Sequence, residues 1–377
     1  MALSGPPFPV GIPAGPDDVV DREEFLAELV QRLGVGQSLM LAGPRRTGKS
    51  SVGLEALRRL RAAGVYTAAV DLFRVTSVEE LAVELTAAVL ANRTGPWETA
   101  VKSLSRLREA LGELRVAAKV HDLELGVKLG ERQLTPEAAL DVALEAADRM
   151  AGRDGTRLVL LFDEFQEAAR MGGTDLLRRL RGVLQQQRHL ACLFLGSQPS
   201  LLRSLFTNRH AALYRFALPL ELPPVPAAAW DQYLTRKLGG DGLAISGAAV
   251  RLLLERTGGH PWCVMEVVSE AWVIRGGERT LTAEHVALAC DRAVRRLTPV
   301  YDAIWAEVRR VRYADAVLAA VAAGRGPYTL GLHHTAVTRA MRHLLEMAVL
   351  TRGPRRGEYG VVEPLFVEAV CRPGPQP

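Results

Sequence analysis

The stretch Gly43-Pro-Arg-Arg-Thr-Gly48-Lys49-Ser50 constrains the fold of this chain more than any other. Two glycines bracket four residues and Lys-Ser follows, which is the full G-x-x-x-x-G-K-[ST] pattern of a phosphate-binding loop. The apolar run at 38–42 predicts a buried strand before the loop, and a periodic segment predicts a helix after it that stops at Gly64. The alternative, a chance match in a glycine-rich loop, leaves these two flanking elements unexplained.

Each residue type in this loop suits a chain of phosphates. The glycines let the backbone curl so that its N–H groups point at phosphate oxygens, and the start of the helix adds a positive field. Lys49, one of only five lysines in the chain, can follow the β- and γ-phosphates as a mobile point charge. Ser50 offers a hydroxyl to Mg²⁺. The expected nucleotide contacts are Gly43, Pro44, Arg45, Arg46, Thr47, Gly48, Lys49, Ser50 and Ser51.

An acidic pair follows a second buried strand. The run at 158–162 is continuously apolar, which is typical of a strand in the middle of a parallel sheet, and it ends in Asp163-Glu164. We expect Asp163 to lie near the Mg²⁺, directly or through water, and Glu164 to polarise an attacking water. The alternative is a pair of surface acids that caps the next helix. The phosphate loop favours the catalytic interpretation, because the two motifs complete one site.

A third apolar run, at 190–195, ends in Gly196-Ser197-Gln198. Its position at the end of a neighbouring strand predicts that Ser197 reaches the γ-phosphate as a sensor. Alternatively, Ser197 caps the helix that begins near Pro199.

Three arginines, Arg203, Arg209 and Arg215, lie between this run and the last expected strand at 216–222. Such a region can face a neighbouring nucleotide in an assembly. A solvated helix face is the expected role of Arg203 and Arg209.

Strands alternate with helices over about the first 220 residues, which predicts an α/β layered fold with a parallel sheet and helices on both faces. A further strand is expected at 65–73, a helix at 94–114, and an inserted strand or hairpin at 120–129. The Pro-rich stretch at 219–226 breaks the pattern, and only helices are expected over 227–297. The expected domains are a flexible leader (1–18), an α/β core (19–223), a helical lid (224–298) and a C-terminal domain (299–377).

Composition narrows the class of protein. At 48% apolar and 24% charged residues it is that of a soluble globular protein, and no apolar run approaches the roughly 20 residues of a membrane-spanning helix. The four cysteines are scattered without zinc spacing, which fits a reducing cytoplasm. The net charge of +5 lies in the segment from Arg295 onward, where twelve arginines face seven acids. Such a basic end is compatible with nucleic acid as a partner.

The order of these motifs resembles AAA+-related ATPases of the STAND type, in the archaeal and bacterial family near the origin-recognition proteins. Val20-Asp21-Arg22 begins a stretch similar to the family's GRE-E-L box, which helps enclose adenine, with Asp21 in place of the usual glycine. The resemblance therefore implies nucleotide contacts by Val20 and Arg22. Leu213-Tyr214-Arg215 is similar to the family's LYGR stretch, so Arg215 would carry any finger or sensor role.

Gly258-Gly259-His260-Pro261 looks like the family's GG-P motif in the lid, where a Pro-capped helix start approaches the nucleotide. This implies nucleotide contacts by His260 and Pro261. The residues alone indicate only a helix break and restart, with His260 as a loop residue.

The C-terminal segment is similar to the family's winged helix. Residues 335–350 fit a recognition helix, 351–360 fit a wing, and Glu363-Pro364-Leu365-Phe366 resembles the family's DPLF. Only the stretch at 324–334 separates the first helix of this segment from the candidate recognition helix, which is short for a full middle helix.

Basic residues in this segment are candidates for contacts with double-stranded DNA phosphates and base edges. Three lie along one stripe of the expected recognition helix and three in the wing: Arg339, Arg342, His343, Arg352, Arg355 and Arg356. Few aromatic residues lie near them, which argues against stacking on single strands. The alternatives are a solvated basic face, or a winged helix that packs against the ATPase core.

Two functions of different classes follow. The first is a slow Mg-ATP-hydrolysing switch, coupled to DNA through the winged helix. The second is an ATP-gated signalling or assembly switch that binds a protein partner or itself and no DNA. A P-loop kinase is a third reading, but the acidic pair and the long helical tail favour hydrolysis. ATP rather than GTP is expected from the resemblance and from the absence of an Asn/Thr-Lys-x-Asp guanine-reading motif.

Overall fold

The computed structural model describes residues 7–91, 119–120, 123–124, 135–353, 355 and 357–371. The chain forms two compact units. We call Arg22–Gly43 with Lys49–Leu222 the sheet unit, and Met1–Asp21 with Pro44–Gly48 and Pro223–Pro377 the helical unit.

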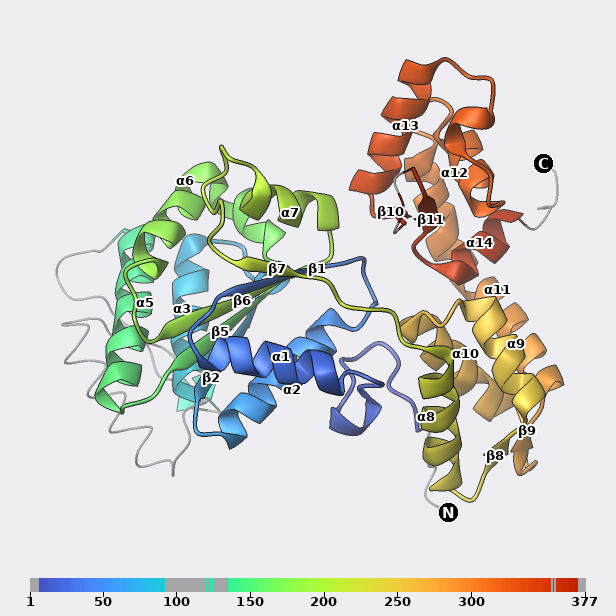
Figure 1. The fold of residues 1–377 in the computed structure, drawn as a ribbon, viewed down its shortest axis with the longest axis horizontal. Coiled ribbons are helices and arrows are strands. Elements are labelled where there is room, and N and C mark those ends of the chain that lie inside the picture. Colours follow the sequence, from blue (N-terminus) through green and yellow to red (C-terminus); the bar gives the residue numbers. More distant parts are fainter. Residues whose placement is uncertain are drawn as a thin grey trace. The chain divides into compact units, whose positions relative to one another are not determined.

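A five-stranded sheet organises the sheet unit (Figure 1). Its strands are β1 (Leu39–Ala42), β2 (Tyr66–Asp71), β5 (Leu158–Asp163), β6 (Leu190–Gly196) and β7 (Leu218–Leu220). They run in the order β2-β5-β6-β1-β7, and every neighbouring pair is parallel. The predicted α/β fold class is therefore confirmed.

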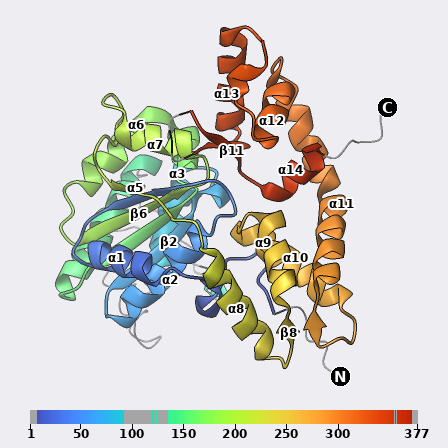
Figure 2. The same cartoon turned by 45° about the vertical axis from the view of Figure 1, so that its right-hand side comes forward.

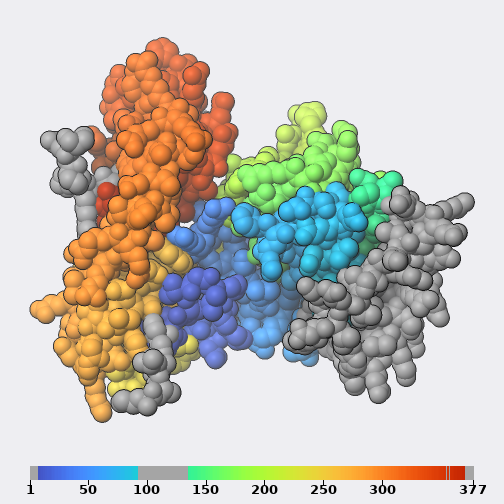
Figure 3. Space-filling view, turned by 180° about the vertical axis from the view of Figure 1, so that it is seen from behind, coloured from blue at the N-terminus to red at the C-terminus, as the bar shows by residue number. Residues whose placement is uncertain are grey.

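Helices cover both faces of this sheet, which is why its central strands are apolar on both sides (Figures 1 and 2). One face carries α1 (Glu23–Gly34) and α2 (Lys49–Ala62). The other carries α3 (Val78–Ala91), α5 (Pro136–Arg153) and α6 (Gln166–Leu184), the last interrupted by non-helical Gly173. Seen from behind, α3 in cyan and α6 in green form part of the outer surface (Figure 3).

The close approach of α2 to the sheet depends on Gly53. A Cβ added at this position would lie 2.7 Å from Leu161 Cδ1 and 2.9 Å from Leu195 Cδ1. The helix that follows the phosphate-binding loop is thus seated directly on β5 and β6, the two strands whose ends carry the candidate catalytic residues.

The inserted segment is described only in part. Two short strands, β3 (Lys119–Val120) and β4 (Leu123–Glu124), pair antiparallel, as a hairpin requires. The helix expected at 94–114 and the rest of the expected strand at 120–129 lie outside the described residues.

The first part of the helical unit contains α8 (Ala227–Gly239), α9 (Gly247–Thr257), α10 (Pro261–Ile274) and α11 (Ala283–Val308). The expectation of helices only was wrong, since β8 (Ala244–Ile245) and β9 (Thr280–Leu281) form a small parallel pair. The expected domain boundary at 298–299 falls inside α11, which continues through Pro299. Residues of α11 on both sides of that proline belong to one hydrophobic core.

The C-terminal part contains α12 (Ala314–Ala322), the 3-10 turn η3 (Pro327–Thr329) and α13 (His334–Glu346). The hairpin of β10 (Leu350–Arg352) and β11 (Tyr359–Val361) and the helix α14 (Pro364–Cys371) follow. The stretch at 324–334 is short for a full middle helix, and it contains only the single turn η3.

Two residues of the amino-terminal segment at 7–18 contact α8. Phe8 is only 5% exposed and meets Tyr233 of α8 edge to face. Asp18, in the 3-10 turn η1 (Pro16–Asp18), accepts hydrogen bonds from the Tyr233 hydroxyl at 2.7 Å and from Lys237 Nζ at 2.6 Å. Within the described ranges, no helix is both long and apolar enough to cross a membrane.

Candidate nucleotide-binding site

The candidate site lies at the carboxyl ends of the parallel strands. Ala42 at the end of β1 pairs with Gly196 at the end of β6, and the Gly43 N–H donates to the Gly196 carbonyl at 3.3 Å. Asp71 at the end of β2 is in register with Asp163 at the end of β5. Open α/β sheets bind ligands at this edge, so the fold gathers here the polar residues that follow each apolar run.

The backbone of the phosphate-binding loop takes conformations that suit its sequence. Gly48 has φ +94°, a value that glycine adopts without strain, and Arg46 has φ +64°. The Thr47 hydroxyl donates to the Pro44 carbonyl at 3.0 Å. Arg45 and Arg46 are exposed, whereas Pro44, Thr47, Gly48, Ser50 and Ser51 are half-buried.

Within the helical unit, the Arg46 guanidinium lies 4.0 Å from the centroid of the Trp262 ring. It also pairs with Glu363 at 3.2 Å. Lys49 begins α2 and is 5% exposed, so its ammonium group belongs to the interior of the site rather than to the surface.

Asp163, at the end of β5, lies within hydrogen-bond distance of Ser50 in α2. The Ser50 hydroxyl is hydrogen-bonded to the Asp163 carboxylate. Burial raises the pKa of Asp163, as do the charges of Glu164 and Asp71, and the hydrogen bonds from Ser50 and the Glu164 N–H only partly oppose this. Oxygen ligands of this kind fit Mg²⁺, which uses one or two carboxylates together with substrate phosphates and water. The described residues contain no group of three or more His, Cys, Asp and Glu side chains that could hold a metal alone.

Glu164 is held by donors from two other residues. Its Oε2 accepts from the Ser197 hydroxyl at 2.6 Å, from the Ser197 N–H at 3.2 Å, and from the Gln166 amide. Burial works to raise the pKa of Glu164, but these hydrogen bonds and the charge of Lys49 outweigh it, so the pKa lies below its usual value. Glu164 also has φ +50°, which is a strained conformation for a residue other than glycine. The carboxylate is therefore ionised at neutral pH and fixed in position.

Ser197 is 1% exposed and directs its hydroxyl at Glu164. The alternative in which Ser197 caps the next helix is not observed, because α7 (Pro199–Thr207) has Gln198 at its N-cap without a side-chain capping bond. Sequence reasoning did not identify Gln166, the second hydrogen-bond partner of Glu164. Gln166 lies two positions beyond it and is 1% exposed, yet no local pattern distinguishes it from a surface glutamine.

The predicted arginine roles divide. Arg203 and Arg209 are both exposed. Arg203 lies on α7 and pairs with Glu221 at 2.5 Å, whereas Arg209 lies in the turn that follows the end of α7 at Thr207 and not on a helix face. Arg215 is exposed with φ +57°, and its guanidinium lies 5.2 Å from the centroid of the Tyr214 ring. The acidic pair and Ser197 are thus brought together with Lys49 and Ser50, whereas Arg215 extends from the surface.

The adenine-side candidates take conformations that suit a turn. Asp21 has φ +50°, the left-handed conformation that glycine adopts most easily, and Arg22 after it is 5% exposed. Val20 is half-buried against the core of the helical unit. His260 is the half-buried N-cap residue of α10, Pro261 occupies its first turn, and the preceding Gly258-Gly259 has positive φ throughout.

The basic residues of the C-terminal part are partly accessible. Arg339 and Arg342 of α13 are exposed. His343 does not share this exposure, because its Nε2 lies 3.0 Å from the Glu307 carbonyl oxygen of α11 and the ring is half-buried.

In the hairpin, Arg352 and Arg355 are exposed, and Arg355 pairs with Glu358 at 3.8 Å. Arg356 lies outside the described residues.

No protein-family model matches the chain, and no curated protein matches it. Solved structures do share its fold. A Walker-type ATPase of Pyrococcus abyssi superposes with a TM-score of 0.71 at 20% identity, over 97% of this chain and 99% of that one. The ORC2 protein of Aeropyrum pernix, in ADPNP and ADP complexes, gives 0.60 at 13% identity over 98% and 95%. Its ADP form gives 0.54 at 13% identity over 93% and 92%. The chain therefore shares the fold of these three structures.

Proposed function

We propose that this chain binds and slowly hydrolyses Mg-ATP and acts as a nucleotide-dependent switch. One observation carries the proposal: Lys49 and Ser50 begin the helix after a phosphate-binding loop, and Asp163, Glu164 and Ser197 stand at neighbouring strand ends with hydrogen bonds joining Ser50 to Asp163 and Ser197 to Glu164. The fold shared with a protein described as a Walker-type ATPase supports it.

The roles follow from the chemistry of phosphoryl transfer to water. Lys49 would contact the β- and γ-phosphates, and Ser50 and Asp163 would hold Mg²⁺, which when bound neutralises charge between those two phosphates. Glu164 would accept the proton of the attacking water as the water oxygen bonds to the γ-phosphorus and the bond to the β-phosphate oxygen breaks, giving ADP and phosphate. Glu164, whose pKa lies below its ordinary value, is ionised at neutral pH as a proton acceptor must be, and its fixed position beside Asp163 supports this role.

Two variants separate binding from turnover. Lys49→Ala should abolish tight ATP binding, and Glu164→Gln should retain binding while losing hydrolysis. Binding is measured with a fluorescent ATP analogue and turnover by phosphate release. Glu167→Gln is the matched control, because it removes the charge of a carboxylate three residues after Glu164 that pairs with Arg170. Hydrolysis by Glu164→Gln at the wild-type rate would contradict the assignment of the base.

We further propose that the switch is coupled to double-stranded DNA through a winged-helix-like C-terminal part. Its helix–turn–helix and hairpin order supports this, as do the exposed Arg339 and Arg342 on α13 and the exposed Arg352 and Arg355 in the hairpin. His343 is not included, because its ring contacts the backbone of α11.

The salt dependence of DNA binding tests this coupling. Each lost phosphate contact should reduce the slope of log affinity against log salt by about 1. Arg339→Ala/Arg342→Ala should therefore reduce the slope by about 2 in fluorescence anisotropy with duplex DNA, whereas Arg251→Ala/Arg279→Ala, which removes two other exposed arginines, should leave it unchanged. Absence of binding at low salt would instead favour a switch that acts on a protein partner or on itself.

A further inference from the structure

Gln166 is an unusual residue to find beside a reactive carboxylate. It begins α6 and is 1% exposed, and its Nε2 donates to Glu164 Oε2. Its Oε1 is buried and has no hydrogen-bond partner among the described residues. Exchanging the amide oxygen and nitrogen would oppose two acceptors, so the contact with Glu164 decides the orientation of the amide.

Burying an unpaired acceptor costs stability, and a buried apolar side chain of the same length would avoid that cost. The neighbouring strand is nevertheless shaped to admit the amide. A Cβ at Gly196 would lie 2.5 Å from Gln166 Oε1 and 2.9 Å from Leu202 Cδ2, so a glycine ends β6 where Gln166 needs the space. Local sacrifices of stability of this kind are expected at functional positions.

The three donors on Glu164 all reach the same oxygen. The Ser197 hydroxyl and N–H come from the end of β6, and the Gln166 amide comes from α6. Donors from two elements fix the carboxylate in rotation as well as in position. Lys49 in α2 contributes positive charge near Glu164, and Asp163 precedes Glu164 in the chain.

We propose that Gln166 is a positioning residue for ATP hydrolysis: together with Ser197 it holds Glu164 by Oε2 and so directs Oε1 to accept the proton of the attacking water. This inference rests on the proposed ATPase function. Misplacing a catalytic group by about 1 Å can cost about 100-fold in rate, so the loss of one of its holding donors is expected to lower kcat by about 10- to 100-fold.

The test is a double-mutant cycle with Gln166→Met, which keeps the length of the side chain and removes both amide groups. Because the unpaired oxygen is removed as well, the thermal midpoint should be unchanged or higher. We expect kcat to fall about 10- to 100-fold, with KM for ATP and Kd for ADP within about twofold of wild type. In the Glu164→Gln background, where the base is absent, single-turnover hydrolysis should show no further loss. Gln185→Met, an exposed position at the end of the same helix, is the control.

Gly196→Ala provides a second perturbation, because its Cβ would displace the Gln166 amide while leaving Gln166 and Glu164 in the chain. It should lower kcat in the same way. Wild-type kcat in Gln166→Met, or an equal loss in both backgrounds, would overturn the positioning role and leave the ATPase assignment intact. Absence of ATP hydrolysis by the wild-type protein would instead refute the proposed function, and the inference with it.

Discussion

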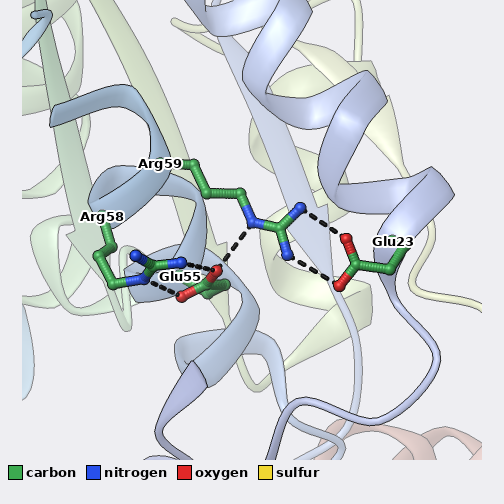
Figure 4. A network of polar contacts seen from close by, with 4 residues as sticks. All are labelled: Glu23, Glu55, Arg58 and Arg59. Carbon is green, nitrogen blue, oxygen red and sulfur yellow. Dashed lines mark hydrogen bonds and ion pairs between the residues drawn. The ribbon is translucent and has the colours of Figure 1, made fainter. Parts of the chain in front are cut away.

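Removing the carboxylate of Glu55 should destabilise the sheet unit far more than removing that of Glu23, although both carboxylates bind Arg59 (Figure 4). The Glu55 side chain, in α2, is 4% exposed. It accepts from Arg58 Nε at 2.7 Å, from Arg58 Nη2 at 2.8 Å and from Arg59 Nε at 2.8 Å. Glu23, at the start of α1, accepts two bonds from Arg59 at 2.8 Å, but its side chain is 77% exposed.

The magnitudes follow from this difference in exposure. A hydrogen bond to a charged group contributes about 1.5–3 kcal/mol when it is shielded from water, and an exposed ion pair about 0–1 kcal/mol. The Arg58 side chain is 55% exposed, and water can replace Glu55 as its hydrogen-bond partner, so its two bonds contribute less than shielded bonds would. Glu55→Ala is therefore expected to cost about 2–3 kcal/mol in total. Glu23→Ala should cost about 0.5 kcal/mol. For a unit of this size, 1 kcal/mol corresponds to about 2–4 °C in Tm.

The assay is thermal unfolding by circular dichroism at low and high salt, with Glu24→Ala as an exposed control on α1. Glu55→Ala should lower the Tm by about 4–12 °C at both salt concentrations, because buried pairs are screened weakly. Glu23→Ala should lower it by about 1–2 °C, and only at low salt. Equal shifts for the two variants would refute the reasoning that burial decides the strength of this network.

Three further outcomes are expected. The hydrogen bond from Arg59 lowers the pKa of Glu23, and the hydrogen bond from Arg58 lowers that of Glu55, so both ion pairs stabilise the fold at neutral pH. This stabilisation is lost as the pH falls below the ordinary value of 4.5. Glu55→Gln should therefore flatten the acid side of the Tm–pH profile, and an unchanged profile would contradict this. Burial raises the pKa of Cys192 to about 12, so in a variant with this as its only cysteine a thiol reagent at pH 8 should react no faster than the protein unfolds. Gly53→Ala should destabilise the protein by about 1–3 kcal/mol, because the added Cβ overpacks against Leu161. Gly182→Ala should stabilise it by up to about 1 kcal/mol in chemical denaturation, because an added Cβ there meets no atom within 4 Å. The reverse order of stabilities would argue against close packing of α2 on the sheet.

The ends of the buried strands were predictable because the signals are local. A phosphate-binding loop and two apolar runs that each end in polar residues are patterns of fewer than about ten residues, and parallel strands bring such ends to one edge of a sheet. These local signals placed Ser50 and Asp163 at the same edge of the sheet, where a hydrogen bond joins them.

The side-chain partners within the site were less accessible to sequence reasoning. The Gln166 amide lies against Gly196, about thirty residues further along the chain, and the bond between Ser197 and Glu164 joins residues from two strand ends. No period or motif encodes such pairings, because they depend on the distance between elements after packing.

Two features of the helical unit could not be predicted from local sequence patterns. The leader is rich in Pro and Gly and has no periodicity, yet Phe8 and Asp18 are held by α8, more than two hundred residues away in sequence. Proline usually ends a helix, but α11 continues through Pro299, and Tyr301 beyond it is buried with its hydroxyl donating to Glu363 at 2.8 Å. In both cases tertiary packing overrides the local signal.

The identity of the bound nucleotide tests the central claim most directly. Wild-type protein, Glu164→Gln and Lys49→Ala would be incubated with ATP and Mg²⁺, separated rapidly from free nucleotide and denatured, and the released nucleotide identified by chromatography. We predict ADP on the wild type, ATP on Glu164→Gln and neither on Lys49→Ala. No nucleotide on the wild type, or ADP formed on Glu164→Gln as fast as on the wild type, would contradict the account.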